Sequence, residues 1–312
     1  MLSILNSYET KHKRQILSAD IDYYNRYVCT SSADGVIHMV DTLGSKHHSL
    51  VELKEHIGPV WQVMFSHPKF GYLASCGSDG KLILHKMKKL DQWYVVYKYD
   101  RHKLPTTSID WAPYKTGAII ACSSSDGTIS IHTLYSNEWS VSKIPNAHLN
   151  GVNCISWAPY LINNQLVLVS GGNDTKIKLW IEQKSVWYVM YESDSQLANI
   201  KDISWCPTPG LQKYIIASCT VDGQVIVWSS DDFYNWTTTE IDATEQNKSK
   251  VSWSQIGCIL SVTMNNDGIK LWKQVGKQNW MCLDRKVTRK PQPSFEHQIK
   301  HSINTDIFSG IF

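Results

Sequence analysis

Three residues in the middle of the chain, His148, Ser170 and Asp174, are of the types that form a hydrolytic catalytic triad. In such a triad the histidine takes the proton of the serine hydroxyl, and the carboxylate orients the imidazole. His297 and His301 form a second candidate, because histidines four residues apart on a helix can share a metal ion, although no third ligand accompanies them. The elements that carry these residues decide between a chemical and a structural role.

Those elements belong to a unit that occurs six times along the chain. Each copy ends in a turn of small and polar residues followed by a short apolar strand, as in ASCGSDGKLILH and VSGGNDTKIKLW. The six turn positions are Asp34, Asp79, Asp126, Asp174, Asp222 and Asn266, at spacings of 45, 47, 48, 48 and 44 residues. This period and signature are typical of the four-stranded blades of a WD-type β-propeller. The sequence therefore predicts an all-β, six-bladed propeller that is either closed and small or open.

The second copy shows the strands that we expect in a blade. Val60–Phe65 alternates as a half-buried strand, and Tyr72–Cys76 and Leu82–His85 flank an Asp-Gly hairpin, a turn that requires positive φ. On this pattern the propeller spans residues 16–283, between an N-terminal extension (1–15) and a basic tail (284–312). The tail is expected to be a flexible end, or a short segment that docks on a partner or on this chain's own open side.

Composition argues against several classes of function. The formal net charge of +3 gives no reason to expect nucleic-acid or membrane-surface binding. The chain has no run of 18 apolar residues and no signal-peptide core at its start, so no membrane insertion is predicted. Its eight cysteines form no CxxC pair, and four of them, Cys29, Cys76, Cys122 and Cys219, stand in equivalent positions before the blade turns. Buried free thiols indicate a reducing compartment, and we expect no metal, cofactor or small-molecule substrate.

The repeat also gives the candidate triad a structural role. In WD-type blades the positions of His148, Ser170, Asp174 and Trp180 are those of a buried hydrogen-bonded tetrad, whose polar groups all have partners. The serine would then be held inside the blade, away from any cleft, and the sequence predicts no catalytic residue. Other copies keep only parts of this set, since Gln196 falls where blade five should have its histidine.

Four segments resemble the Sec-thirteen family, the small WD-repeat subunit of the COPII outer coat and of the nuclear pore. They are GPVWQVMFSHPKFGYLASCGSDGK (58–81), SIDWAPYKTGAIIACSSSDG (108–127), AHLNGVNCISWAP (147–159) and ISWCPTPGLQKYIIASCTVDG (203–223). The resemblance extends from Asp20 to Trp272. The Seh-one-like nucleoporins share the architecture, but the HPKFG and GVN…WAP strings favour the Sec-thirteen branch.

The resemblance implies an open six-bladed propeller whose first and last blades do not close on each other. An α-solenoid partner, either the large cage subunit of the COPII coat or a scaffold nucleoporin, would donate a seventh blade in trans. That blade would cover unpaired strand edges and apolar faces. The implied locations are the cytoplasmic face of ER-derived vesicles and the nuclear envelope. The candidate residues of this partner-blade groove are Leu17, Ala19 and Ile21 in blade one and Val251, Trp253, Ile259 and Leu271 in blade six.

A second class of function stays open, a stand-alone WD-repeat adaptor that recognises peptides on its top face. An adaptor would be well behaved alone, with the tail closing the ring. A scaffold subunit would be poorly soluble without its partner. Nothing in the sequence favours an enzyme.

Overall fold

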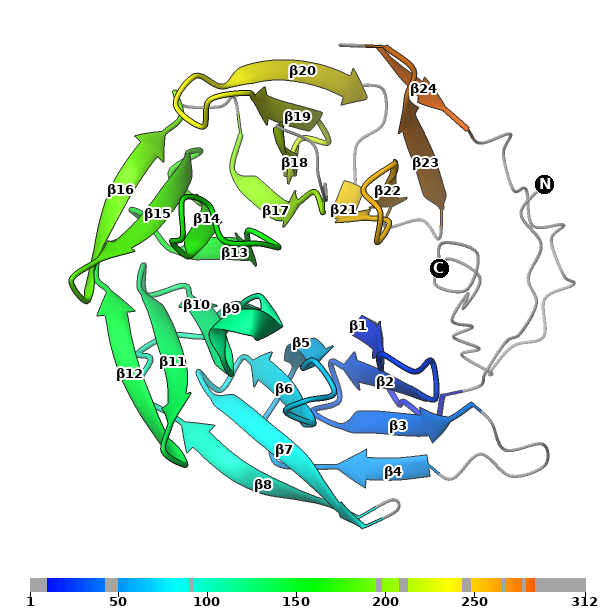
Figure 1. Cartoon of the computed structure of the whole chain (residues 1–312). Coiled ribbons are helices and arrows are strands. Elements are labelled where there is room, and N and C mark those ends of the chain that lie inside the picture. Colours follow the sequence, from blue (N-terminus) through cyan, green and yellow to red (C-terminus); the bar gives the residue numbers. More distant parts are fainter. Residues whose placement is uncertain are drawn as a thin grey trace, which may run out of the picture.

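The computed structural model describes residues 10–42, 50–89, 92–194, 198–207, 213–242, 248–264, 268–276 and 279–283. In this part the chain forms six four-stranded antiparallel sheets. The sheets stand around a common centre as the blades of a propeller, with the first strand of each blade innermost and the fourth at the rim (Figure 1). The prediction of an all-β, six-bladed propeller is confirmed.

Each blade takes its four strands in chain order. The first three blades comprise β1 (Ile16–Ile21), β2 (Tyr27–Ser32), β3 (Ile37–Asp41) and β4 (Leu50–Leu53); β5 (Val60–Phe65), β6 (Tyr72–Gly77), β7 (Leu82–Lys89) and β8 (Gln92–Tyr99); and β9 (Thr106–Trp111), β10 (Ile119–Ser124), β11 (Ile129–Tyr135) and β12 (Glu138–Ile144). The last three comprise β13 (Val152–Trp157), β14 (Val167–Gly172), β15 (Ile177–Gln183) and β16 (Val186–Glu192); β17 (Ile200–Trp205), β18 (Tyr214–Thr220), β19 (Val225–Ser230) and β20 (Thr237–Asp242); and β21 (Lys248–Trp253), β22 (Ile259–Met264), β23 (Ile269–Gln274) and β24 (Trp280–Cys282). One turn of 3-10 helix, η1 (Tyr114–Thr116), precedes β10.

The turn between the second and third strands has the backbone conformation that its sequence predicts. Gly80 and Gly127 follow the turn aspartates with φ values of 72° and 82°, where glycine carries no steric penalty. Blade four is different, because Thr175 takes this position with a φ of 64°. A β-branched residue is strained in this region, so the Asp174 turn is held by its surroundings.

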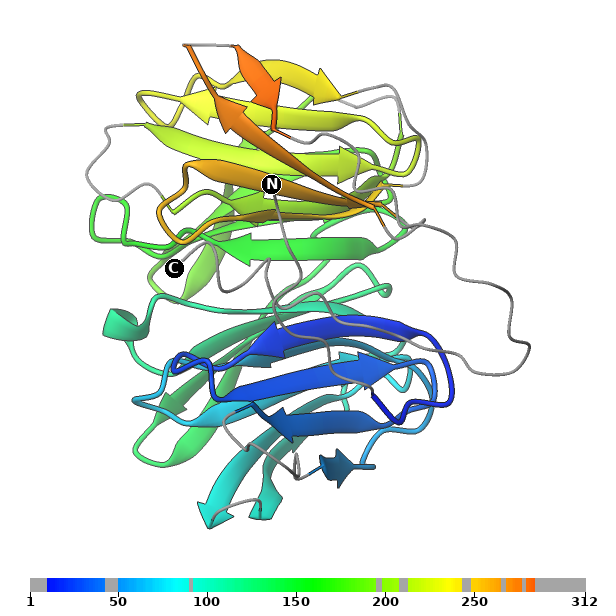
Figure 2. The same ribbon diagram turned by 90° about the vertical axis from the view of Figure 1, so that its right-hand side faces the viewer.

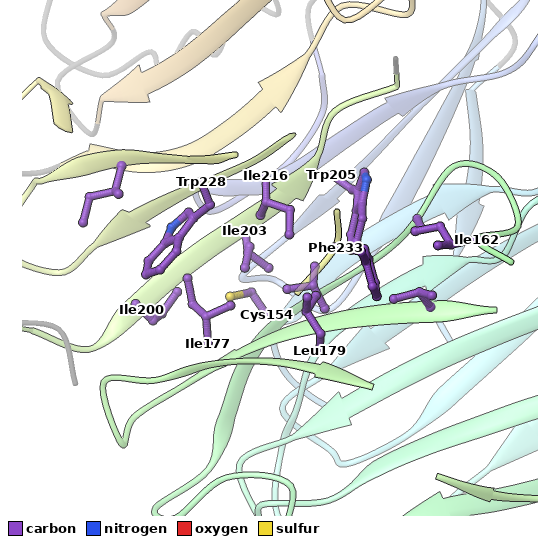
Figure 3. Close-up of a cluster of buried hydrophobic side chains, with 14 residues drawn as sticks. Cys154, Ile162, Ile177, Leu179, Ile200, Ile203, Trp205, Ile216, Trp228 and Phe233 are labelled. Atoms are coloured by element: carbon purple, nitrogen blue, oxygen red, sulfur yellow. The ribbon is translucent and has the colours of Figure 1, made fainter. Parts of the chain in front are cut away.

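The hydrophobic core is divided among the interfaces between successive blades. Five clusters of buried side chains join blade one to two, two to three, three to four, four to five and five to six. Figure 3 shows the cluster between blades four and five, where Leu179 of β15 meets Ile203 and Trp205 of β17. Among the described residues no such cluster joins blade six to blade one, and both views show these two blades apart (Figures 1 and 2).

Candidate partner interface

The residues of the candidate triad lie in one buried network inside blade four. Trp180 donates its indole N–H to Ser170 Oγ over 2.8 Å, and Ser170 Oγ lies 2.7 Å from His148 Nε2. His148 Nδ1 lies 2.7 Å from Asp174 Oδ1. Burial alone would raise the pKa of Asp174, but hydrogen bonds from His148 and from two backbone N–H groups hold it below its usual value. Ser170 has no exposed surface, so a substrate cannot reach its hydroxyl.

Two further histidines take part in equivalent networks and were missed in the sequence. His12 lies 3.0 Å from Thr30 Oγ1 and 3.1 Å from Asp34, and His102 lies 2.8 Å from Ser130 Oγ and 3.4 Å from Asp126. His12, His56, His102 and His148 recur at spacings of 44, 46 and 46 residues, a signal that the sequence contains. Each histidine thus connects the segment that precedes its blade to the aspartate in the hairpin turn of that blade.

The other chemistry-bearing candidates lie outside the described residues. These are Gln196, Asn266, His297 and His301, together with the whole of the tail from residue 284. Within the described ranges, no group of three histidine, cysteine or acidic side chains is arranged to hold a metal ion. The described part also contains no helix with the length and apolar character needed to cross a bilayer. None of the eight cysteines forms a disulfide.

The space between blade one and blade six is bordered by sheet faces. Each blade has the same two edges, its innermost strand and its rim strand, so the missing interface exposes no additional strand edge. Within the described residues, no blade packs against the face of blade one that points away from blade two or the face of blade six that points away from blade five, although Val28, Val40 and Leu271 on these faces are buried. We call these two surfaces the open faces.

The open face of blade one carries two of the predicted groove residues. Ala19 and Ile21 alternate along β1 with Asp20, whose carboxylate accepts a hydrogen bond from blade two. Both therefore point away from blade two. Leu17 lies at a β-bulge between Ile16 and Ser18, where the strict alternation of faces is interrupted. In the later blades the position of Ile21 holds Phe65, Trp111, Trp157, Trp205 and Trp253, which pack on the preceding blade.

The prediction for blade six is wrong for two of its four residues. Val251 belongs to the cluster shared with blade five, and the Trp253 indole donates to the Ser204 carbonyl of that blade over 3.1 Å. Both side chains thus face blade five. Ile259 and Leu271 lie on the opposite, open face, since their strands pair so that Leu260 and Trp272 take the covered side. Their contact with a partner stays a prediction.

Carboxylates of the innermost strands line the centre of the propeller. Asp20, Asp110 and Asp202 are half-buried by surface area but enclosed by neighbouring blades, and desolvation raises the pKa of the first two to about 7 and of the third to about 6. Hydrogen bonds from backbone N–H groups oppose this rise. The charge of Lys250 in blade six also opposes the rise at Asp20 of blade one and at Asp202 of blade five.

Comparisons with known proteins agree with this architecture. The model of the family "WD domain, G-beta repeat" matches residues 139–180. The chain is 39% identical over 203 residues to "Protein SEC13 homolog" of Drosophila melanogaster, covering 60% of this chain and 57% of that protein. It is 36% identical over 189 residues to "Protein transport protein sec13" of Emericella nidulans, covering 54% of this chain and 61% of that protein.

A third relative, "Protein transport protein SEC13" of Cryptococcus neoformans, is 34% identical over 202 residues, covering 55% of this chain and 60% of that protein. The chain thus spans about three fifths of the length of the relatives that it matches. The six blades and the WD-repeat match show a WD-repeat β-propeller, and the three relatives show that this chain is similar to proteins named SEC13.

Proposed function

We propose that this protein is a structural scaffold subunit of a protein-transport complex and that a partner completes its open propeller with a seventh blade. The observation that carries the proposal is the unmatched interface. Five pairs of successive blades share a buried apolar cluster, while in the described part of the chain blades six and one share none.

A four-stranded sheet like the other blades would fit between the two open faces. Ile21 on one side and Ile259 on the other are half-buried. Met281, which is two strands away from Ile259 on the same face, is 49% exposed. A sheet inserted between them would bury both faces at once. Such an interface would be of the obligate kind, on the order of 2,000 Å². The resemblance to the Sec-thirteen family favours an α-solenoid protein as the donor.

The names of the relatives support a role in vesicle transport. Two of the three compared above are called protein transport proteins. The family resemblance extends the proposal to the COPII coat on ER-derived vesicles and to the outer ring of the nuclear pore. The role is mechanical, because the serine, histidine and aspartate that could suggest hydrolysis serve a buried network in blade four.

The proposal is tested by capture of partners on a tagged full-length chain from its native cells at physiological salt. We expect stoichiometric recovery of a large α-solenoid protein that carries a strand-rich segment, and its identity separates coat from pore. Recovery of the chain alone, or with substoichiometric peptide-bearing proteins, would favour the adaptor. A chain that ends at Leu283 tests whether the tail covers the open faces: a loss of thermal stability would support this closure.

A matched pair of variants tests whether recovery of the partner depends on the open faces. Ala19→Arg places a charge on the open face of blade one and should abolish recovery of the partner. Val186→Arg adds the same charge at an exposed position on the rim strand β16, where Val186 is 50% exposed, and should leave recovery unchanged. Circular dichroism of both variants checks that each retains the fold.

A further inference from the structure

Every pair of successive blades is joined by one recurring hydrogen bond at the centre of the propeller. A side-chain oxygen on the innermost strand of one blade accepts from a backbone N–H on the innermost strand of the next. We call this an inner-strand bond. The five bonds are Asp20 Oδ2 to Phe65 N at 2.7 Å, Gln62 Oε1 to Ile109 N at 2.9 Å, Asp110 Oδ2 to Trp157 N at 2.6 Å, Ser156 Oγ to Trp205 N at 3.2 Å and Asp202 Oδ2 to Val251 N at 2.9 Å.

The five bonds use two registers. In the first register the accepting side chain stands at the position of Asp20 and the donor is the aromatic residue that ends the next inner strand, as with Ser156 and Trp205. In the second register the acceptor stands two residues earlier, as Asp202 does, and the donor is the apolar residue two before the strand's end, as Val251 is. Blades two to five thus each carry an acceptor on one face and present an N–H on the other.

Blade six has an acceptor of the first register on its open face, where none of the described blades packs. The cross-strand pair Ser252–Ser261 places Ser252 at the position of Asp20 on the open face. Ser252 is exposed, whereas Asp20, Asp110 and Ser156 at the same position are half-buried under the next blade. The second-register position holds Lys250, whose ammonium group cannot accept a hydrogen bond. Blade six can therefore form this bond only through Ser252.

Blade one presents the complementary half. Its positions equivalent to the donors Val251 and Trp205 are Ala19 and Ile21, which lie on the other open face. Among the described strands, none lies on this side of β1 to supply an acceptor to their N–H groups.

We propose that the innermost strand of the donated blade is fixed by two inner-strand bonds, one to each side. Its last residue donates its backbone N–H to Ser252 Oγ. The same strand carries an aspartate, asparagine, glutamine or serine whose oxygen accepts from the N–H of Ala19 or Ile21. By the first register the donor residue is aromatic, so the partner strand ends in tryptophan or phenylalanine. The accepting residue stands directly before this aromatic residue if it bonds Ile21, and three residues before it if it bonds Ala19. This inference rests on the proposed function and specifies the chemistry of its partner.

The bond at Ser252 is tested by the affinity of the full chain for the α-solenoid protein recovered by capture. Ser252→Ala should weaken binding about 2- to 12-fold, the loss of one net hydrogen bond. Ser252→Asp should restore it, because aspartate is the acceptor at this position in blades one and three. Ser204→Ala is the matched control at the same position in blade five, where Asp202 makes the inner-strand bond, and should bind like the wild type.

Amide hydrogen exchange of β1 tests the other bond. The N–H groups of Ala19 and Ile21 should gain protection when the recovered partner binds, and lose that gain when the accepting residue of the partner strand is replaced by valine. Partner binding with unchanged affinity in Ser252→Ala and unchanged exchange in β1 would overturn the inference while leaving the proposed function intact. Protection in the chain alone that disappears after truncation at Leu283 would assign the open faces to the tail, and failure to recover any partner would overturn both proposals.

Discussion

The carboxylate of Asp110 lies 2.6 Å from the backbone nitrogen of Trp157, so a side chain of blade three is fixed to the main chain of blade four. The indole N–H of Trp157 also donates a hydrogen bond of 3.1 Å to the backbone carbonyl of Asp110. Asp110→Ala should lower the free energy of unfolding by about 1–3 kcal/mol, because it leaves the enclosed Trp157 N–H without an acceptor. Urea unfolding measures the loss. Asp110→Asn keeps an oxygen acceptor and should lower the free energy of unfolding clearly less. Equal decreases in the two variants would argue against the bond.

The enclosed carboxylates make stability depend on pH. The pKa of Asp20 and of Asp110 is about 7 in the folded protein against 3.8 for an unperturbed aspartate. A raised pKa means that the folded chain holds protons that the unfolded chain has released, so this contribution is complete below pH 3.8 and is lost as the pH rises towards 7. Asp79, whose pKa is lowered to about 2, acts in the opposite direction at acid pH and loses its contribution as the pH falls from 3.8.

We therefore expect the stability advantage of the wild type over Asp110→Asn to shrink between pH 5 and pH 8. The change should be on the order of 1–3 kcal/mol, since each unit of pKa difference is worth about 1.4 kcal/mol. Urea unfolding of both proteins at the two pH values measures it, and the comparison cancels groups that the variants share. Parallel pH profiles for the two proteins would contradict the expectation.

The strained hairpin of blade four offers a stabilising substitution. Thr175→Gly should raise the free energy of unfolding by about 1 kcal/mol, because glycine adopts a φ of 64° without the steric penalty of a β-branched residue. Thermal unfolding should show a higher midpoint. The reverse change at the equivalent turn, Gly127→Ala, should destabilise, since its Cβ would lie 2.7 Å from the His148 carbonyl oxygen. A Thr175→Gly protein that unfolds earlier than the wild type would show that the threonine makes a compensating contact.

The tetrad of blade four predicts that Ser170→Ala lowers the free energy of unfolding more than Ser218→Ala does in blade five. Ser170→Ala removes the partner of both the Trp180 indole and the His148 imidazole and should cost about 2–4 kcal/mol. Ser218→Ala in blade five leaves the Trp228 indole without the hydroxyl that it donates to over 2.9 Å, and should cost about 1–2 kcal/mol. Denaturant unfolding ranks the two. A smaller loss for Ser170→Ala than for Ser218→Ala would contradict the network.

The sequence predicts the fold well because each blade repeats one local pattern. The turn residues fix where two strands meet, and alternation then places the strands on either side, as in the second copy, where β5 spans the predicted Val60–Phe65. His12 and His102 were not predicted because the rest of the tetrad is incomplete in their blades, where Val40 and His132 take the position of Trp180. Only their spacing from His56 and His148, and no strand pattern, identifies them.

The open faces could be predicted less well. Alternation divides β21 into two sets of side chains but does not say which set meets the preceding blade, and a shift of one residue exchanges the two sets. For this reason the sequence wrongly placed Val251 and Trp253 on the open face and did not identify Ser252. The inner-strand bonds also elude sequence reasoning, because Asp, Gln and Ser serve the same purpose in different registers.

The separate cluster at each interface means that a blade is stabilised directly only by its neighbours. In such an array, unfolding requires the least free energy at the two ends and the most in the middle. Blades one and six are the two ends, because each packs against one described blade and the inner blades pack against two. A molecule that bridged them would remove the ends altogether, and disassembly would then have to begin by breaking two interfaces at once.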